Sequence, residues 1–128
     1  MNEPHAILPA TPTAPPGVTV YAVQESAVNM LPATAYGKLV VMLPSSFRTM
    51  FASQPAARRL RSIMRNMKPD DLLLPVGDPV AIALASAIMA ERTGGWLNIL
   101  KWDNQEKCYF PVKIDVFDRY PGTLRQSA

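Results

Sequence analysis

The chain has 128 residues, of which 48% are hydrophobic and 18% are charged, and its formal net charge is +3. This length fits a single domain, and so much apolar material with so little charge excludes a disordered protein. The mild positive excess is compatible with nucleic acid or an acidic protein as a partner and requires neither.

The sequence lacks the residues on which several kinds of site depend. Its one cysteine, Cys108, excludes an intramolecular disulfide and a multi-cysteine metal site, and its one histidine, His5, lies near the start of the chain. No nucleophile–histidine pair, metal or cofactor is therefore predicted, which argues against an enzyme. No signal-peptide pattern is present, and no apolar run reaches the roughly 20 residues that span a bilayer. We expect a soluble cytoplasmic protein without a membrane partner.

Residues 1–17 have a composition of their own, with five prolines among alanines and threonines. Proline removes backbone donors and disfavours helix at the residue before it, so this segment is predicted to be a flexible tail. A proline-rich ligand for a partner domain is the other interpretation, although no basic residue flanks it. We expect the single domain over residues 18–120 and a short C-terminal tail over residues 121–128.

The first two strands are predicted from short apolar runs. Val18 to Gln24 has apolar residues on both faces, and a turn or a single helical turn is expected over residues 26–32. Lys38 to Leu43 is a continuous apolar run, which is typical of a central, parallel strand.

A helix rich in arginine is predicted next. Residues 47–53 are expected to form a short helix and Pro55 to begin the following one, because a proline at the first helical position loses no hydrogen bond. Apolar residues then recur at helical spacing on one side, namely Ala56, Leu60, Ile63, Met64 and Met67. The other side carries four basic residues and no acidic one, namely Arg58, Arg59, Arg61 and Arg65.

The rest of the fold is organised around a strand, a turn and a helix. Leu72 to Val76 is predicted to be a short buried strand that frays at Pro75. Asp78 is a natural N-cap for the helix that follows, over residues 80–90. That helix is apolar at all but one position, so it is expected to be buried on most sides.

A β-hairpin is predicted after the glycine pair at residues 94–95. Its strands are Trp96 to Trp102 and Tyr109 to Val116, joined by a polar turn. Pro111 indicates that the second strand lies at an edge of the sheet. Alternation in that strand predicts that one set of side chains faces inward, namely Phe110, Val112, Ile114 and Val116. The residues between them, beginning with Tyr109, are expected to face outward.

These elements follow one another in the order β-β-α-β-α-β-β. Strand–helix–strand connections are right-handed and join parallel strands. The sequence therefore predicts a small single α/β domain with a mixed sheet of about five strands, two main helices and a C-terminal hairpin.

Gly77 and Asp78 lie where a core strand meets a helix, the position at which open α/β sheets bind ligands. A carboxylate there could hold a metal, a ribose hydroxyl or a proton, whereas as an N-cap it would stabilise the helix by about 1 kcal/mol. The cap also explains Pro79, so we favour it and keep the ligand site as the alternative. Asp70 and Asp71, before the strand, are interpreted as solvated linker residues.

The arginine side of the helix is the strongest functional signal. Clustered arginines can follow a line of phosphates, and the hairpin aromatics Trp96, Trp102 and Tyr109 could add a surface on which bases stack. The predicted nucleic-acid site comprises Arg58, Arg59, Arg61, Arg65 and Lys101. The competing interpretation is an ordinary solvated helix face, since short basic clusters are common on soluble proteins.

One pattern of residues extends from Lys68 to Val116. It consists of Lys68-Pro69-Asp70-Asp71-Leu72-Leu73-Leu74, Gly77-Asp78-Pro79, Gly94-Gly95, Leu100-Lys101-Trp102-Asp103, Tyr109, Pro111-Val112 and Ile114-Asp115, with a looser match over Gly37 to Pro44. In this pattern, which covers under half of the chain, the protein resembles a group of small uncharacterised proteins from tailed bacteriophages and marine viruses. The group has no known activity. The resemblance therefore implies a phage origin and a bacterial host cytoplasm, and it assigns no residue a role.

Three functions are compatible with these observations, in order of preference. The first is a non-enzymatic phage accessory protein that binds DNA or RNA through the arginine side of its helix. The second is a protein-interaction module, either a homo-oligomer paired through the hairpin edge at residues 108–116 or an inhibitor of a host protein. The third is a small nucleotide-acting enzyme that uses Asp78.

Overall fold

The computed structural model describes residues 16–119 of the chain. Most of the predicted N-terminal tail, with His5, and the predicted C-terminal tail lie outside these residues. Among residues 16–119, no helix is long and apolar enough to cross a membrane.

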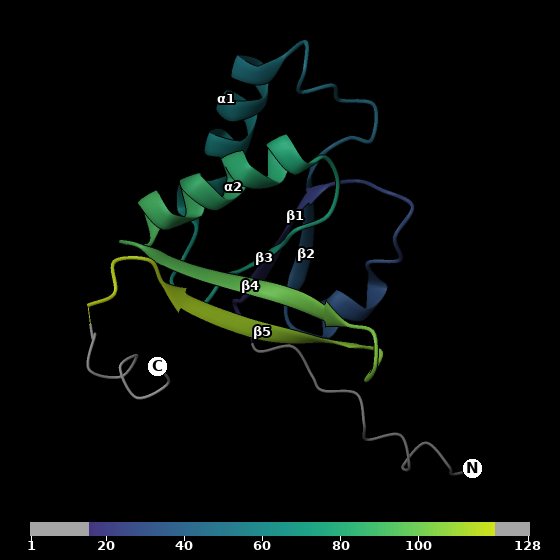
Figure 1. Ribbon diagram of the computed structural model, residues 1–128, viewed down its shortest axis with the longest axis vertical. Helices are drawn as coiled ribbons and strands as arrows, with labels where there is room; N and C mark the ends of the chain where they lie inside the picture. The colour runs from purple at the N-terminus through teal and green to yellow at the C-terminus, as the bar shows by residue number, and fades with distance from the viewer. Residues whose placement is uncertain (1–15, 120–128) are drawn as a thin grey trace.

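Five strands form one mixed sheet (Figure 1). They are β1 (Thr19–Gln24), β2 (Lys38–Leu43), β3 (Leu72–Leu74), β4 (Trp96–Asp103) and β5 (Cys108–Asp115). Their spatial order is β2-β1-β3-β4-β5; the first four run parallel, and β5 returns antiparallel to β4. The predicted α/β domain with a five-stranded mixed sheet and a C-terminal hairpin is confirmed.

Both α-helices lie on the same side of the sheet (Figure 1). α1 (Ser53–Ile63) continues into the 3₁₀ turn η3 (Met64–Asn66) and leads to β3, and α2 (Pro79–Arg92) connects β3 to β4. The opposite side is partly covered by η2 (Leu31–Ala35), a 3₁₀-helix between β1 and β2. The chain steps from β1 to β2 in one direction and from β2 to β3 in the other, so right-handed connections place η2 and α1 on opposite faces.

β1 lies between two apolar layers. Tyr21 and Val23 pack beneath the helices, and Val20 and Ala22 pack on the other face together with Ala33 of η2. This confirms the prediction that the strand is apolar on both faces. All of these residues are buried because β1 has a strand on each side and a layer on each face.

β2 is an edge strand, so the prediction that residues 38–43 form a central strand is wrong. It does run parallel to β1, as predicted. Val40 and Met42 pack with the helices, and Leu39 packs on the side of η2. The continuous apolar run therefore reports that both faces of the strand are covered, a property that an edge strand can share with a central one.

The chain between β2 and α1 also differs from the prediction. Residues 47–52 form no helix, contrary to the short helix predicted over residues 47–53, and α1 begins at Ser53, two positions before Pro55. The amide of Ala52 bonds the carbonyl of Arg48, so the chain turns once before the helix starts. Pro55 still lies in the first helical turn, where amides have no helical partner, so its missing N–H removes no bond.

α2 is less buried than its composition predicts. Ala81 and Ala85 face the sheet and are buried, but Val80, Ala83 and Ala87 are exposed. The prediction of burial on most sides is wrong because α2 lies in an outer layer, where the sheet covers one of its faces and α1 another.

In β5 the alternation of side chains is as predicted, but the burial is not. Phe110 and Ile114 are exposed, whereas Tyr109, expected to face outward, is only 4% exposed. Phe110 and Ile114 do lie on the helix side of the sheet, but the helices pack over β1 to β4. Tyr109 faces the side of η2, where the hydroxyl of Tyr36 donates to its backbone carbonyl at 2.7 Å.

Pro111 lies on the free edge of the sheet, as predicted. The amide of Val116 bonds the carbonyl of Gly95 across the hairpin, and hydrogen-bonded pairs alternate with non-bonded pairs from there along the ladder. Because Pro111 stands opposite Leu100, this alternation turns its nitrogen away from β4. The proline thus removes a donor from the free edge and none from the ladder.

Asp71 is buried, so its interpretation as a solvated linker residue is wrong. It is 1% exposed, and its carboxylate accepts hydrogen bonds from the amides of Thr19, at 2.9 Å, and Lys68, at 2.8 Å. These bonds join the start of β1 to the turn before β3. Asp70 is exposed, in agreement with the prediction.

Candidate functional site

Two of the four predicted arginines lie on the outer side of the arginine-bearing segment. Arg58 in α1 and Arg65 in η3 are about two helical turns apart, and both are exposed. Ala56 and Leu60, which are fully buried, mark the opposite side. Arg58 and Arg65 have no carboxylate partner among residues 16–119, so both charges face solvent.

The other two arginines have partners within the fold. Arg59 is turned toward β2, where its Nε donates to the carbonyl of Met42 at 2.8 Å. Arg61 is turned toward α2 and forms an ion pair with Glu91. These contacts attach α1 to β2 and α2. They also leave the guanidinium groups of Arg59 and Arg61 with fewer free N–H donors for a ligand.

The surroundings of α1 are basic over a long stretch of chain. Residues 26–69 contain seven lysines and arginines and no aspartate or glutamate. In the fold this stretch forms η2, β2, α1 and η3, which are grouped around the β2 edge of the sheet. That region therefore has the surplus of positive charge that attracts phosphate backbones.

An exposed aromatic ring lies in the turn before α1. Met50 and Phe51 are 81% and 77% exposed, and the guanidinium carbon of Arg48 lies 6.0 Å from the centroid of the Phe51 ring. A large exposed ring beside a cation is a combination with which proteins hold unpaired bases. The sequence alone does not predict this pair, because the exposure of Phe51 depends on how the chain turns between β2 and α1.

The hairpin aromatics predicted as a stacking surface contact other side chains. The Nζ of Lys113 lies 5.1 Å from the centroid of the Trp96 ring, and Trp102 packs edge to face on Tyr109 with the ring centroids 5.0 Å apart. Lys101 also lies on β4, whereas α1 packs on β2 and α2. The structure therefore does not bring Lys101 to the arginines, and the predicted nucleic-acid residues form two separate groups.

The turn at Gly77 and Asp78 is packed against its neighbours. The Asp78 carboxylate accepts hydrogen bonds from the amides of the second and third residues of α2, at 3.0 and 3.2 Å, so Asp78 is the N-cap of that helix. The buried hydroxyl of Thr49 donates to the same oxygen at 2.6 Å. The amide of Asp78 donates to Oε1 of Gln24 at 2.8 Å.

Gln24, the last residue of β1, occupies the space above this turn. It is buried, and its side-chain amide donates to the carbonyls of Pro44, at 3.1 Å, and Phe47, at 2.9 Å. The side chains of Gln24 and Thr49 thus join the end of β1 to the loops that follow β2 and β3. A ligand site at Gly77 and Asp78 stays a prediction, and the contacts described here serve the fold.

Replacing Asp78 with asparagine should destabilise the protein more near neutral pH than in acid. The hydrogen bond from Thr49 holds the pKa of Asp78 below its ordinary value of 3.8. A carboxyl whose pKa is lower in the folded state stabilises the fold above its unfolded pKa, and this contribution is lost as the pH falls through the folded value.

Urea unfolding of the wild type and Asp78→Asn, at pH values well above and well below 3.8, measures this effect. The free energies of unfolding should differ at the higher pH and converge at the lower one. Asp70→Asn, at an exposed carboxylate, is the control for the loss of a negative charge. A difference that is the same at both pH values would contradict the assignment.

Groups with catalytic or metal-binding chemistry are scarce in the described part of the chain. No three His, Cys, Asp or Glu side chains of residues 16–119 come together as ligands for a metal ion. Cys108 is a free, half-buried thiol. The open space at the carboxyl ends of the strands is an apolar pocket beside the end of β3.

Comparison with known proteins gives one match. Residues 18–116, from just before β1 to just after β5, match the sequence model of a protein family described as phage Pam3 gp32-like protein. This match confirms the resemblance to phage proteins. No curated protein and no solved structure matches the chain.

Proposed function

The chain belongs to the phage Pam3 gp32-like protein family, and from this premise we propose that it is a phage accessory protein that binds single-stranded nucleic acid through the exposed side of α1. The observation that carries the proposal is the stretch over residues 26–69, whose seven positive charges meet no acidic residue in sequence. Arg58 and Arg65 contact phosphates in this proposal, and Phe51 with Arg48 contacts bases.

The preference for single strands rests on Phe51. A ring can stack on a base only where that base is not already stacked inside a duplex. Phe51 projects into solvent next to the first turn of α1, so a strand that follows the arginines can reach it. Lys101 is left out of this interface because it lies on β4, away from α1.

The double variant Arg58→Ala, Arg65→Ala should bind single-stranded DNA or RNA more weakly and with less dependence on salt. Each phosphate contact to a single strand contributes about 0.7 to the slope of log K against log salt, so two lost contacts should lower that slope by about 1.4. Fluorescence anisotropy of labelled oligonucleotides over a salt series measures both quantities. Phe51→Ala should weaken single strands about tenfold and duplexes far less.

The matched control is Lys101→Ala, Lys107→Ala, which removes the same charge from the hairpin. It should change affinity only slightly, because its lysines act on the nucleic acid only through long-range attraction. A wild-type protein that retains no nucleic acid at low salt would refute the proposal. So would a control variant that loses as much affinity as the arginine variant.

A protein partner is the second candidate, and the uncovered face of β5 favours it. Phe110 and Ile114 on the strand and Val116 and Phe117 after it are exposed large hydrophobic residues, which is unusual for a surface without a partner. Pro111 favours contact through these side chains over the addition of another strand. Light scattering tests whether that partner is a second copy of the chain.

A further inference from the structure

An apolar cleft opens where the sheet divides at the end of β3. β3 has three residues and is registered with β4 through Leu73 and Ile99. Beyond it, Pro75 has no N–H to offer, and the carbonyl of Val76 accepts the amide of Gln24 on the side of β1. β4 runs on into the hairpin, so the two strands separate and leave a gap between them.

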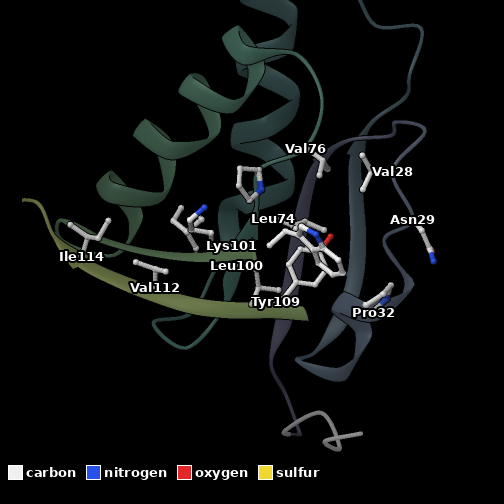
Figure 2. A pocket seen from close by; sticks show the side chains of 13 residues that line it. Val28, Asn29, Pro32, Leu74, Val76, Leu100, Lys101, Tyr109, Val112 and Ile114 are labelled. Atoms are coloured by element: carbon white, nitrogen blue, oxygen red, sulfur yellow. The ribbon is translucent and has the colours of Figure 1, made fainter. Parts of the chain in front are cut away.

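The cleft has the size and composition of a small-molecule site. Its volume is about 850 Å³, and such sites measure roughly 300–1,000 Å³ and are lined mainly by apolar side chains. Its walls come from the loop after β1, the end of β3, β4 and β5 (Figure 2). The apolar lining includes Val28, Pro32, Leu74, Val76, Val112 and Ile114.

One buried polar group in the wall of the cleft has no hydrogen-bond partner among residues 16–119. Tyr109 lines the cleft and is 4% exposed, and Figure 2 shows its side chain among those that line it. No group of residues 16–119 forms a hydrogen bond with its hydroxyl, although its backbone carbonyl accepts a hydrogen bond from the hydroxyl of Tyr36. Buried hydroxyl groups are normally hydrogen-bonded. Burial raises the pKa of Tyr109, so the hydroxyl keeps its proton at neutral pH and can donate it in a hydrogen bond.

Lys101 supplies the charge of the cleft. It is the one charged residue of the described lining, and no carboxylate among residues 16–119 pairs with it. Asn29 and Trp102 also carry polar groups there. The Oδ1 of Asn29 accepts a hydrogen bond from the amide of Leu31 at 3.1 Å, and the indole N–H of Trp102 donates to Oδ1 of Asn104 at 3.1 Å. A ligand would therefore meet apolar walls, with the charge of Lys101 on the helix side of the hairpin and the hydroxyl of Tyr109 on the side of η2.

We propose that this cleft binds a small molecule that has an apolar body and a carboxylate. The body displaces water from the apolar walls, the carboxylate pairs with the ammonium of Lys101, and a second oxygen atom, away from the carboxylate, accepts a hydrogen bond from the hydroxyl of Tyr109. The site is separate from the arginines of α1, so either proposal can fail without the other.

Octanoate and octanol are matched probes, since they share a chain and differ in charge. Calorimetry should show octanoate binding about tenfold more tightly than octanol. Lys101→Met, which keeps an apolar stem, should abolish that difference and leave octanol unchanged. Tyr109→Phe, which removes only the hydroxyl, should weaken octanol about fivefold and octanoate, whose oxygen atoms pair with Lys101, far less. The indole N–H signal of Trp102, which lines the cleft, should shift in the NMR spectrum, while that of Trp96 should not.

Lys107→Met is the control, because Lys107 lies in the hairpin turn outside the cleft and carries the same charge. It should bind both probes as the wild type does. Failure of the wild type to bind either probe would overturn the proposal. Two results would refute the pairing of a carboxylate with Lys101 and would indicate a purely apolar site. One is octanol that binds as tightly as octanoate, and the other is octanoate that binds Lys101→Met as tightly as it binds the wild type.

Discussion

Replacing Asp71 with alanine should lower the free energy of unfolding by about 3 kcal/mol. The substitution leaves the amides of Thr19 and Lys68 without their acceptor, and an unsatisfied buried donor costs roughly 1–3 kcal/mol. The carboxylate also holds the start of β1, the strand with a layer on each face, to the turn that leads into β3. Urea denaturation followed by circular dichroism measures the loss.

Asp70 provides the control for this prediction, because it is adjacent in sequence, carries the same charge and is exposed. Asp70→Ala should change the free energy of unfolding by no more than about 0.5 kcal/mol. Asp71→Asn keeps one acceptor oxygen and should fall between the two alanine variants. Equal losses for Asp70→Ala and Asp71→Ala would show that the buried hydrogen bonds contribute nothing.

Gly77→Ala should destabilise the fold by about 4 kcal/mol, from backbone strain and from a steric clash. Gly77 has φ of +109°, a conformation that side chains disfavour, and a Cβ atom built there would lie 2.4 Å from the Cβ of Gln24. Each effect costs roughly 1–3 kcal/mol. Movement of Gln24 to relieve the clash would also disturb its bonds to Pro44 and Phe47.

Gly94→Ala separates the two effects. Gly94 also has a positive φ, of +72°, but a Cβ atom there would meet nothing within 4 Å. Its loss should be about 1 kcal/mol, from backbone strain alone. Thermal or urea unfolding of both variants gives the comparison. If the two losses are equal, the close packing of Gln24 on Gly77 is not what constrains the turn.

The order of the elements is predictable from the sequence because its signals are local. The apolar run of β2, the helical spacing from Ala56 to Met64, and the cap at Asp78 each depend on residues a few positions apart. The position of β2 at the edge of the sheet depends instead on which strand pairs with which. The same holds for β5, where Phe110 is exposed because the helices end over β4, a fact that β5 itself does not encode.

Buried polar residues are hard to predict for a similar reason. Asp70 and Asp71 are alike in sequence, and only the donors that surround Asp71 in the fold distinguish them. For the arginines of α1, the sequence predicts their positions, whereas the partners of Arg59 and Arg61 come from β2 and α2. The cleft depends on the divergence of β3 from β4, which leaves no signal in a single sequence beyond Pro75.

Pro111 should hinder the growth of fibrils along β5 in concentrated protein. An exposed outer strand offers a row of donors and acceptors on which the strands of further chains can stack without limit. Pro111 interrupts that row within β5, because its nitrogen faces outward and carries no hydrogen. The exposed apolar side chains of β5 can therefore remain available to a partner, while the backbone of the same strand is a poor template for the repeated addition of strands from other chains.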